Sequence, residues 1–428
     1  MLRFNDSNEV IREETYKAIL VGLKLDEDIS YSMEELKGLC EADSIEVIGN
    51  VIQSLEKPNT ATLIGKGKVE ELTELISNMD ADLVVFNDEL SGMQLRNLED
   101  ALDVKVIDRV ILILDIFAKR ASTREGKLQV ELAQLKYRLP RLTGFGKSLS
   151  RLGGGIGTRG PGETKLETDR RHIERRVDDI REELASIRKT RSTQKKRREK
   201  NEIPVVALVG YTNSGKSALM NRILSKVDKE EKQVYEENML FATLDTYQRR
   251  VDLDKNHSFI LVDTIGFVSR LPHLLIEAFK ATLEIVSEAD LLVHVVDSSY
   301  ENHDFQISVT EKVLKEIDAG AKDKIMAFNK IDLVGNRDEL IPVSGVRNHY
   351  ISAKYDYGVD ELIEDIKKEI FKDFIRTEML IPYDRGDAAS FIQSRGTVFG
   401  LEYREDGTYI DCELKIQDYN KYREFELK

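Results

Sequence analysis

The chain has 428 residues, of which 41% are hydrophobic, a net charge of −14 and only two cysteines. This length predicts several domains, and the longest apolar stretch, Val110 to Ala118, is too short to span a membrane. Two distant cysteines form neither a disulfide framework nor a metal cluster, and the first residues lack the apolar core of a secretion signal, so we expect a cytoplasmic protein.

The first part of the chain, residues 1–115, alternates short apolar runs with helical patterns. This alternation predicts a small α/β domain with a mainly parallel sheet. The expected strands are Ala18–Leu23, Val47–Leu55 and Leu83–Phe86, and the expected helices are Met33–Leu39, Val69–Met79 and Met93–Leu102.

Residues 116–200 are predicted to form a helical hairpin. Apolar residues recur there at spacings of three and four, which is typical of amphipathic helices with one narrow stripe. The first stripe is Leu128, Leu132, Leu135, Leu139 and Leu142, and the second is Leu166, Ile173, Val177, Ile180, Leu184 and Ile187. The glycine-rich segment between them, residues 143–163, cannot continue a helix and predicts a loop at the tip of the hairpin.

This hairpin is also where positive charge concentrates. From Lys136 to Lys200 there are 20 Lys/Arg and 9 Asp/Glu, a local charge of +11, which leaves −25 on the remainder. Such segregation favours presentation to a polyanion, with Lys147, Arg151 and Arg159 placed to neutralise phosphates. The alternatives are a solvated charged helix and a flexible linker.

The strongest motif opens the next domain, residues 201–372. Gly210, Gly215, Lys216 and Ser217 fit G-x-x-x-x-G-K-[ST] between an apolar strand and a helical pattern, which predicts a phosphate-binding loop. Lys216 is expected to reach the β- and γ-phosphates, and Ser217 to ligate Mg²⁺. The expected nucleotide contacts of this loop are Gly210, Tyr211, Thr212, Asn213, Ser214, Gly215, Lys216, Ser217 and Ala218.

Two further segments supply the expected switches. In DTIGF, Asp263 would hold Mg²⁺ through a water, and the Gly266 amide would contact the γ-phosphate. In LFATLD, Thr243 is the candidate to close over Mg²⁺ and the γ-phosphate, with Thr246 as the alternative, and Phe241 is counted among the nucleotide contacts. Lys216, Thr243 and Gly266 are therefore the expected catalytic residues, and Ser217, Thr243 and Asp263 the expected metal ligands.

Guanine selectivity is predicted by NKID at an apolar strand end. The Asp332 carboxylate can accept both the N1–H and the exocyclic amine of guanine, a donor pair that adenine lacks. Asn329 and Lys330 complete the motif, and Ser352, Ala353 and Lys354 follow another apolar run, where the Ala353 amide would meet the guanine carbonyl. The three motifs together predict GTP and GDP as substrate and product of a GTPase domain.

Two residues leave alternatives open. Phe267 stands where many GTPases carry a glutamine that orients the attacking water. It either only packs a switch helix or indicates slow hydrolysis without a partner. Asn213 resembles the asparagine of GTPases that recruit K⁺ beside the phosphates, and a hydrogen bond within the loop is an equal alternative.

The final residues, 373–428, alternate short apolar runs with turns and predict a small α+β domain.

With these residues in place, most of the chain resembles the HflX family of translation-associated GTPases. The segments that carry the resemblance are LIGKGKVEEL, GGGIGTRGPGE, LFATLD and DTIGFVSRLPHLLIEAFKATLE. Where the family usually reads ATLDPTTR, this chain has ATLDTYQRR. The resemblance implies an α/β P-loop GTPase domain, preceded by the small α/β domain and the hairpin and followed by the α+β domain.

The resemblance further implies binding to the large ribosomal subunit and its RNA, and a link to splitting, rescue or recycling of ribosomes under stress. In that family the glycine-rich loop approaches the peptidyl-transferase region, which the match at residues 153–162 carries over. We expect a monomer. The alternatives are a potassium-dependent GTPase of RNA modification or ribosome assembly, and a non-enzymatic or membrane-signalling GTP-binding protein. The sequence shows neither an RNA-binding motif of KH type nor a lipidation motif.

Overall fold

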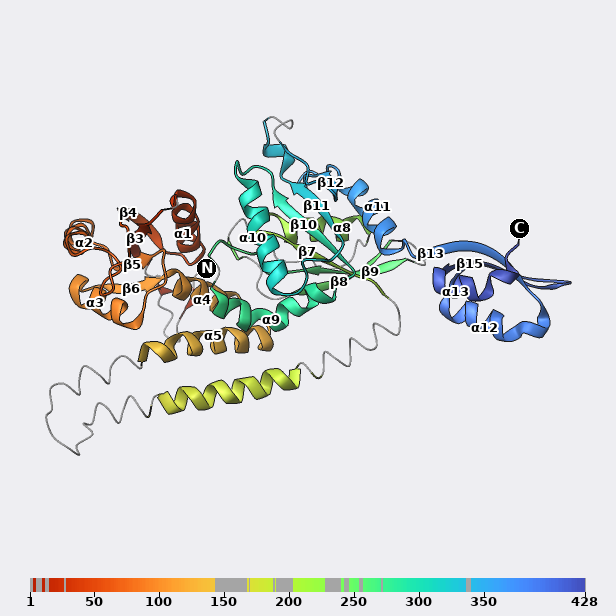
Figure 1. The fold of residues 1–428 in the computed structure, drawn as a ribbon, viewed down its shortest axis with the longest axis horizontal. Helices are drawn as coiled ribbons and strands as arrows, with labels where there is room; N and C mark the ends of the chain where they lie inside the picture. Colours follow the sequence, from red (N-terminus) through yellow and green to blue (C-terminus); the bar gives the residue numbers. More distant parts are fainter. Residues whose placement is uncertain are drawn as a thin grey trace.

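The computed structural model describes residues 3–4, 10–11, 15–26, 28–142, 168, 170–187, 189, 203–227, 240–241, 246–253, 257–270, 272–335 and 340–427 (Figure 1). The glycine-rich loop at 143–163 and Thr243 lie outside these residues, so their predicted roles stay predictions. In the described part, no helix is long and apolar enough to cross a membrane.

The N-terminal region contains a four-stranded parallel sheet in the order β4-β3-β5-β6. Helices cover both faces, because the buried strands are apolar on both sides. The elements are β3 (Lys17–Lys24), α1 (Ser30–Ala42), β4 (Glu46–Ser54), α2 (Lys66–Met79), β5 (Leu83–Phe86), α3 (Gly92–Leu102), β6 (Lys105–Asp108) and α4 (Arg109–Arg120). The predicted strands and helices of this region are confirmed. A short pair, β1 (Arg3–Phe4) and β2 (Val10–Ile11), precedes them.

The two predicted apolar stripes meet along α5 (Arg124–Leu142) and the helix at 170–187. Leu128 and Leu132 pack against Val177, Ile180 and Leu184 in one buried cluster. The pairs Arg124–Glu183 and Arg176–Glu131 show that the two helices run antiparallel. The opposite side of α5 faces the rest of the protein, as Figure 1 shows, so α5 has apolar residues on two sides rather than one.

Tyr137 of α5 anchors the helix to the N-terminal sheet. Its hydroxyl donates to the fully buried Asp108 carboxylate, which also accepts the Leu90 amide at 3.0 Å. Burial and then the Asp108 charge raise the pKa of Tyr137, so the hydroxyl remains a donor at neutral pH.

Replacing Tyr137 with Phe is therefore expected to lower the free energy of unfolding by about 1–2 kcal/mol, because a buried carboxylate loses one donor. Urea denaturation of the full chain measures the change. Tyr403→Phe is the matched control, because Tyr403 is 74% exposed and its replacement should stay within about 0.5 kcal/mol. Equal stability of both variants would show that the Tyr137 contact contributes nothing.

The central sheet has six strands in the order β12-β11-β10-β7-β9-β8. All are parallel except β8, which pairs antiparallel with β9. The strands are β7 (Val205–Val209), β8 (Tyr247–Asp252), β9 (Ser258–Asp263), β10 (Leu291–Asp297), β11 (Lys324–Asn329) and β12 (Arg347–Tyr350). The helices around them are α8 (Lys216–Val227), α9 (His273–Glu288), α10 (His303–Glu316), α11 (Val359–Ile370) and the single turn η1 (Ile331–Leu333).

One hydrophobic core joins the N-terminal region to the central sheet. It runs from Leu36 of α1 and Phe117 of α4 to Phe279 of α9, all of them buried. Phe117 meets Phe241 and Phe279 edge to face, with ring centroids 4.7 and 4.9 Å apart. A shared core of this kind fixes the two regions against one another.

The C-terminal region is a three-stranded antiparallel sheet in the order β13-β15-β14 with helices on one face. Its elements are β13 (Phe374–Ile381), η3 (Tyr383–Arg385), α12 (Gly386–Arg395), β14 (Thr397–Arg404), β15 (Gly407–Lys415), α13 (Ile416–Tyr422) and η4 (Arg423–Phe425). This arrangement confirms the predicted small α+β fold. It lies at the far side of the central sheet from the N-terminal region (Figure 1), and His257 contacts Glu413 across the join at 2.5 Å.

Candidate functional site

The phosphate-loop motif connects β7 to the N-terminus of α8, as the sequence predicts. Gly210 has φ +147° and Gly215 φ +90°, in the region that favours glycine. A Cβ at Gly210 would clash with the Val295 carbonyl, and one at Gly215 with the Asn329 side chain. The loop therefore requires glycine at both positions.

Lys216, the first residue of α8, is buried, with 6% of its surface exposed. Its ammonium donates to the carbonyls of Gly210 at 3.2 Å and Tyr211 at 2.8 Å, so it lies across the loop. Burial lowers the pKa of Lys216 to about 8, and the nearby Asp263 carboxylate acts in the opposite direction. The next side chain, Ser217, donates its hydroxyl to Asp263 Oδ2 at 2.6 Å.

Asp263 ends β9 and is followed by a segment that packs directly on the phosphate loop. The Thr264 hydroxyl donates to the Leu208 carbonyl at 2.6 Å. A Cβ at Gly266 would lie 2.5 Å from Cα of Thr212, so the two backbones touch. The Thr212 amide donates to the Phe267 carbonyl at 2.7 Å, and the Phe267 amide to the Gly210 carbonyl at 3.1 Å. The loop and this segment thus form one continuous hydrogen-bonded unit.

Phe267 and Phe241 are both 1% exposed and belong to the core shared with α4 and α9. Phe267 therefore packs, as one of the two interpretations expects, and its side chain presents no group that could orient a water. The Phe241 ring packs on Phe117, and its amide donates to Thr212 Oγ1 of the phosphate loop at 2.8 Å, so its role as a nucleotide contact stays a prediction.

The other residues predicted at the nucleotide lie in the phosphate loop or close to it in the sequence. Asn213 has φ 59°, a left-handed conformation that asparagine tolerates better than most residues. The Ser214 side chain is fully buried in the loop, and Ala218 lies in the first turn of α8, beside the core under the central sheet. Thr246, the alternative to Thr243, stands immediately before β8.

The base-recognition motifs meet at the same edge of the sheet. Asn329 ends β11, donates to the Ser214 carbonyl at 2.9 Å and accepts the Ala353 amide at 3.0 Å. Asp332 Oδ1 accepts the Ser352 hydroxyl at 2.5 Å. Asn329 therefore ties the phosphate loop to the segment at 352–354, and Asp332 is held beside that segment.

Two residues that sequence reasoning missed support this arrangement. Asp297 ends β10 and binds the Lys330 ammonium at 2.7 Å. Arg222 of α8 donates to the carbonyls of Ala353 and Lys354, each at 2.8 Å. A charged residue directly after the apolar run of β10 was a signal for Asp297, whereas Arg222 has no local signal because its partners lie 131 and 132 residues away.

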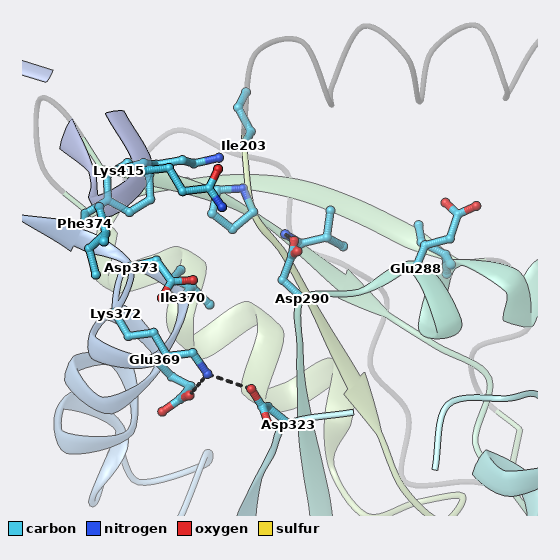
Figure 2. A pocket seen from close by; sticks show the side chains of 15 residues that line it. Ile203, Glu288, Asp290, Asp323, Glu369, Ile370, Lys372, Asp373, Phe374 and Lys415 are labelled. Carbon is cyan, nitrogen blue, oxygen red and sulfur yellow. Dashed lines mark hydrogen bonds and ion pairs between the residues drawn. The ribbon is translucent and has the colours of Figure 1, made fainter. Parts of the chain in front are cut away.

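A cavity of about 700 Å³ lies between the central sheet and the C-terminal region (Figure 2). Its rim is acidic, and Lys372 bridges Asp323 and Glu369 there at 2.7 and 2.6 Å. None of the described residues that line it belongs to the three nucleotide motifs. This cavity is therefore separate from the candidate nucleotide site.

Three features together define a P-loop GTPase. They are the six-stranded sheet, the loop at a helix N-terminus that requires glycine at two positions, and the NKID and SAK segments at one carboxyl edge of the sheet. Three family models match the chain. They are described as "GTP-binding GTPase N-terminal" at residues 30–118, "GTP-binding GTPase Middle Region" at 120–198 and "50S ribosome-binding GTPase" at 205–330.

The chain belongs to the HflX family of GTPases, as the resemblance predicts. It is 48% identical to GTPase HflX of Caldanaerobacter subterraneus subsp. tengcongensis over 420 residues, 98% of this chain and 96% of the other. It is 37% identical to GTPase HflX of Escherichia coli over 413 residues, 95% of each chain. A crystal structure of a GTP-binding protein from Sulfolobus solfataricus with GDP is 23% identical, with a TM-score of 0.44, covering 84% of this chain and 99% of that one.

Proposed function

We propose that the chain binds and hydrolyses GTP at the loop Gly210–Ser217 and couples this cycle to binding of the large ribosomal subunit. The observation that carries the nucleotide part is the junction at Asn329, whose side chain contacts both the phosphate loop and the Ala353 amide. In the proposal, one nucleotide spans both places, with its phosphate chain at the loop and its base beside Ala353.

Each phosphate-loop residue has a proposed task. The amides of residues 211–217 would surround the β-phosphate at the N-terminus of α8, where the helix dipole favours an anion. The buried Lys216 ammonium would exchange its two carbonyl partners for phosphate oxygens, which are stronger acceptors.

The donor set of Ser217 and Asp263 fits Mg²⁺. Mg²⁺ takes oxygen ligands, and here a hydroxyl and a carboxylate oxygen lie 2.6 Å apart beside the Lys216 ammonium. No cluster of three or more His, Cys, Asp or Glu side chains suited to a metal occurs among the described residues, so phosphate oxygens and water would complete the shell. When bound, the ion neutralises charge that develops on the phosphates. Thr243 is proposed as a further ligand on the sequence alone, and K⁺ beside Asn213 stays a prediction.

In the base site, Asp332 would accept the guanine N1–H and exocyclic amine, while Ser352 holds one carboxylate oxygen in place. Lys330, fixed by Asp297, would lie over the base plane. The Ala353 amide would meet the guanine carbonyl. Lys354 has its ammonium 5.1 Å from the Tyr355 ring centroid and would border the same site.

The ribosomal part of the proposal rests on the family and on charge. The model that matches residues 205–330 is described as a 50S ribosome-binding GTPase, and the segment from Lys136 to Lys200 carries 20 basic residues in an acidic chain. We propose that this segment contacts ribosomal RNA, that the protein acts as a cytoplasmic monomer, and that the cycle serves splitting, rescue or recycling of ribosomes. Co-sedimentation with large subunits in GTP, GDP or a non-hydrolysable analogue tests the proposal, and equal or absent binding in all three would contradict it.

The double replacement Arg151→Ala and Arg159→Ala is expected to weaken binding to large subunits and to flatten its salt dependence, because each lost phosphate contact reduces the slope by about one. GTP affinity should stay unchanged. The matched control is the pair Arg376→Ala and Arg404→Ala in the C-terminal region, measured by sedimentation over a salt series. Unchanged ribosome binding in the first variant would show that the loop at 143–163 is only a linker.

A further inference from the structure

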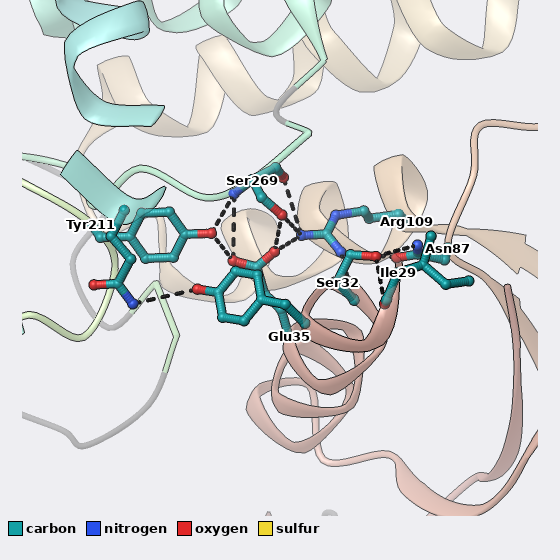
Figure 3. Close-up of polar contacts among 9 residues, drawn as sticks. Ile29, Ser32, Glu35, Asn87, Arg109, Tyr211 and Ser269 are labelled. Carbon is teal, nitrogen blue, oxygen red and sulfur yellow. Dashed lines mark hydrogen bonds and ion pairs between the residues drawn. The ribbon is translucent and has the colours of Figure 1, made fainter. Parts of the chain in front are cut away.

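The two loops of the candidate nucleotide site are held by different parts of the molecule. In the phosphate loop, the Tyr211 hydroxyl donates to Glu35 within a buried polar cluster that also contains Arg109 and Ser269 (Figure 3). The other loop, residues 352–358, lies between β12 and α11, and we call it the base loop. Its side-chain anchors come from α8, the helix whose N-terminus closes the phosphate loop.

The base loop is closed by its own hydrogen bonds. The Ser352 amide donates to the Tyr357 carbonyl at 3.0 Å, and the Tyr357 amide to the Ser352 carbonyl at 3.1 Å. The Ser352 hydroxyl oxygen also accepts the Tyr355 amide at 3.2 Å. Gly358, the last residue of the loop, has φ 68°, and a Cβ there would lie 2.6 Å from the Tyr350 carbonyl oxygen. The loop therefore keeps its own shape, and its placement depends on what holds it from outside.

Arg222 of α8 holds the part of the base loop that follows Ala353. Its Nε donates to the Ala353 carbonyl and its Nη2 to the Lys354 carbonyl, each at 2.8 Å. A guanidinium is a planar fork with fixed N–H directions, so it orients both of these successive peptide groups. The Ala353 amide, one peptide group earlier, donates to Asn329 at 3.0 Å. The Arg222 fork thus determines where this amide lies.

Lys226 holds the end of the base loop. It lies four residues after Arg222, on the same face of α8. Its ammonium binds Asp356 of the loop at 3.0 Å and Asp360, in the first turn of α11, at 2.6 Å. The Asp360 side chain is 75% exposed, so water weakens this ion pair and it contributes less than the Arg222 fork does.

The helix that carries these two cations also carries the proposed phosphate contacts. Lys216 and Ser217 are the first two residues of α8. Leu219 and Ile223 of the same helix are fully buried in the core under the central sheet, which fixes α8 against the sheet. The phosphate end of the site and the base loop are therefore held at a set separation by one element.

We propose that Arg222 and Lys226 are positioning residues for guanine recognition, which place the Ala353 amide against the guanine carbonyl and slow the release of GDP. This inference rests on the proposed function, in which that amide contacts the carbonyl. Without the Arg222 fork, the base loop stays closed but is no longer held at one distance from the base. The proposed contacts of Asp332 with the guanine N1–H and amine remain, because Asp332 belongs to η1 and not to the base loop.

The test compares the affinities of the full chain, with Mg²⁺, for GDP, 6-thioguanosine diphosphate and inosine diphosphate. The thio analogue replaces the carbonyl oxygen by sulfur, a weak acceptor, and inosine lacks the exocyclic amine. Arg222→Ala should bind GDP and inosine diphosphate about 5- to 10-fold more weakly than the wild type, and the thio analogue less than about twofold more weakly. The preference for GDP over the thio analogue therefore falls, whereas the preference over inosine diphosphate stays.

A second readout is the release of a fluorescent GDP during a chase with unlabelled GDP. Arg222→Ala should release it faster by about the factor lost in affinity, because affinity changes within one site act mostly on dissociation. Lys226→Ala should change affinity and release in the same direction by about twofold. Arg222→Lys keeps the charge but not the fork, so it should restore little of the preference for GDP over the thio analogue.

Arg404→Ala in the C-terminal region is the matched control and should leave all three affinities unchanged. An unchanged preference for GDP over the thio analogue in Arg222→Ala, or an equal loss of all three nucleotides, would overturn the positioning role. Failure of the wild type to bind GDP would instead overturn the proposed function. If circular dichroism shows that Arg222→Ala does not fold, Arg222→Lys decides by the same ratios.

Discussion

Lys216→Ala is expected to lose GTP and GDP affinity by about a thousandfold or more. The ammonium is positioned for oxygens of the β- and γ-phosphates, and each hydrogen bond to a charged group contributes about 1.5–3 kcal/mol. The alanine also leaves the Gly210 and Tyr211 carbonyls without the donor that they have at 3.2 and 2.8 Å. Titration with a fluorescent guanine nucleotide measures the loss.

Lys312→Ala is the matched control for this variant. Lys312 is an exposed lysine of α10, outside the three nucleotide motifs, so its removal should leave both affinities unchanged. Circular dichroism of both variants shows whether the fold is retained. Nanomolar binding by a folded Lys216→Ala protein would refute the phosphate-loop assignment.

Asp332→Asn is expected to reverse base preference, with GTP affinity lower by about a thousandfold and xanthosine triphosphate bound in preference. A carboxylate accepts two hydrogen bonds from guanine, whereas the amide offers one donor that suits the second carbonyl of xanthine. The Ser352 hydroxyl, 2.5 Å from Asp332 Oδ1, can still donate to the amide oxygen, so the side chain should keep its position.

Competition between GTP and xanthosine triphosphate for a labelled nucleotide measures this change. Asp304→Asn, at an exposed carboxylate in the first turn of α10, is the control and should keep full guanine preference. If Asp332→Asn also kept it, another residue would have to recognise the base.

The elements that the sequence predicts well are those whose signal is local. The apolar runs at Leu83–Phe86 and Val205–Val209 are strands because both faces are buried. The apolar stripe that includes Leu128 and Leu132 packs against the stripe that includes Val177 and Ile180, because spacings of three and four place each set on one helix face. The three nucleotide motifs are likewise local, and the parallel sheet brings the ends of their strands to one edge.

What the sequence could not predict are contacts between distant residues. Glu35 and Arg109 are 74 residues apart, and Glu35 and Ser269 are 234 apart, so no periodicity connects them. The Tyr211 side chain turns toward Glu35 because Glu35 and Ser269 satisfy its buried hydroxyl. Phe241 lies in a switch motif, and no local pattern predicts that the shared core of the two regions buries its ring.

The central claim is a GTPase cycle that depends on the ribosome, and one measurement tests it most directly. The rate of phosphate release from GTP should be measured for the purified protein alone and with added large ribosomal subunits. Because the buried Phe267 side chain cannot orient water, we predict turnover well below one per second for the protein alone, and a rise of at least about tenfold with the subunits. Turnover of several per second without subunits, unchanged when they are added, would contradict the account.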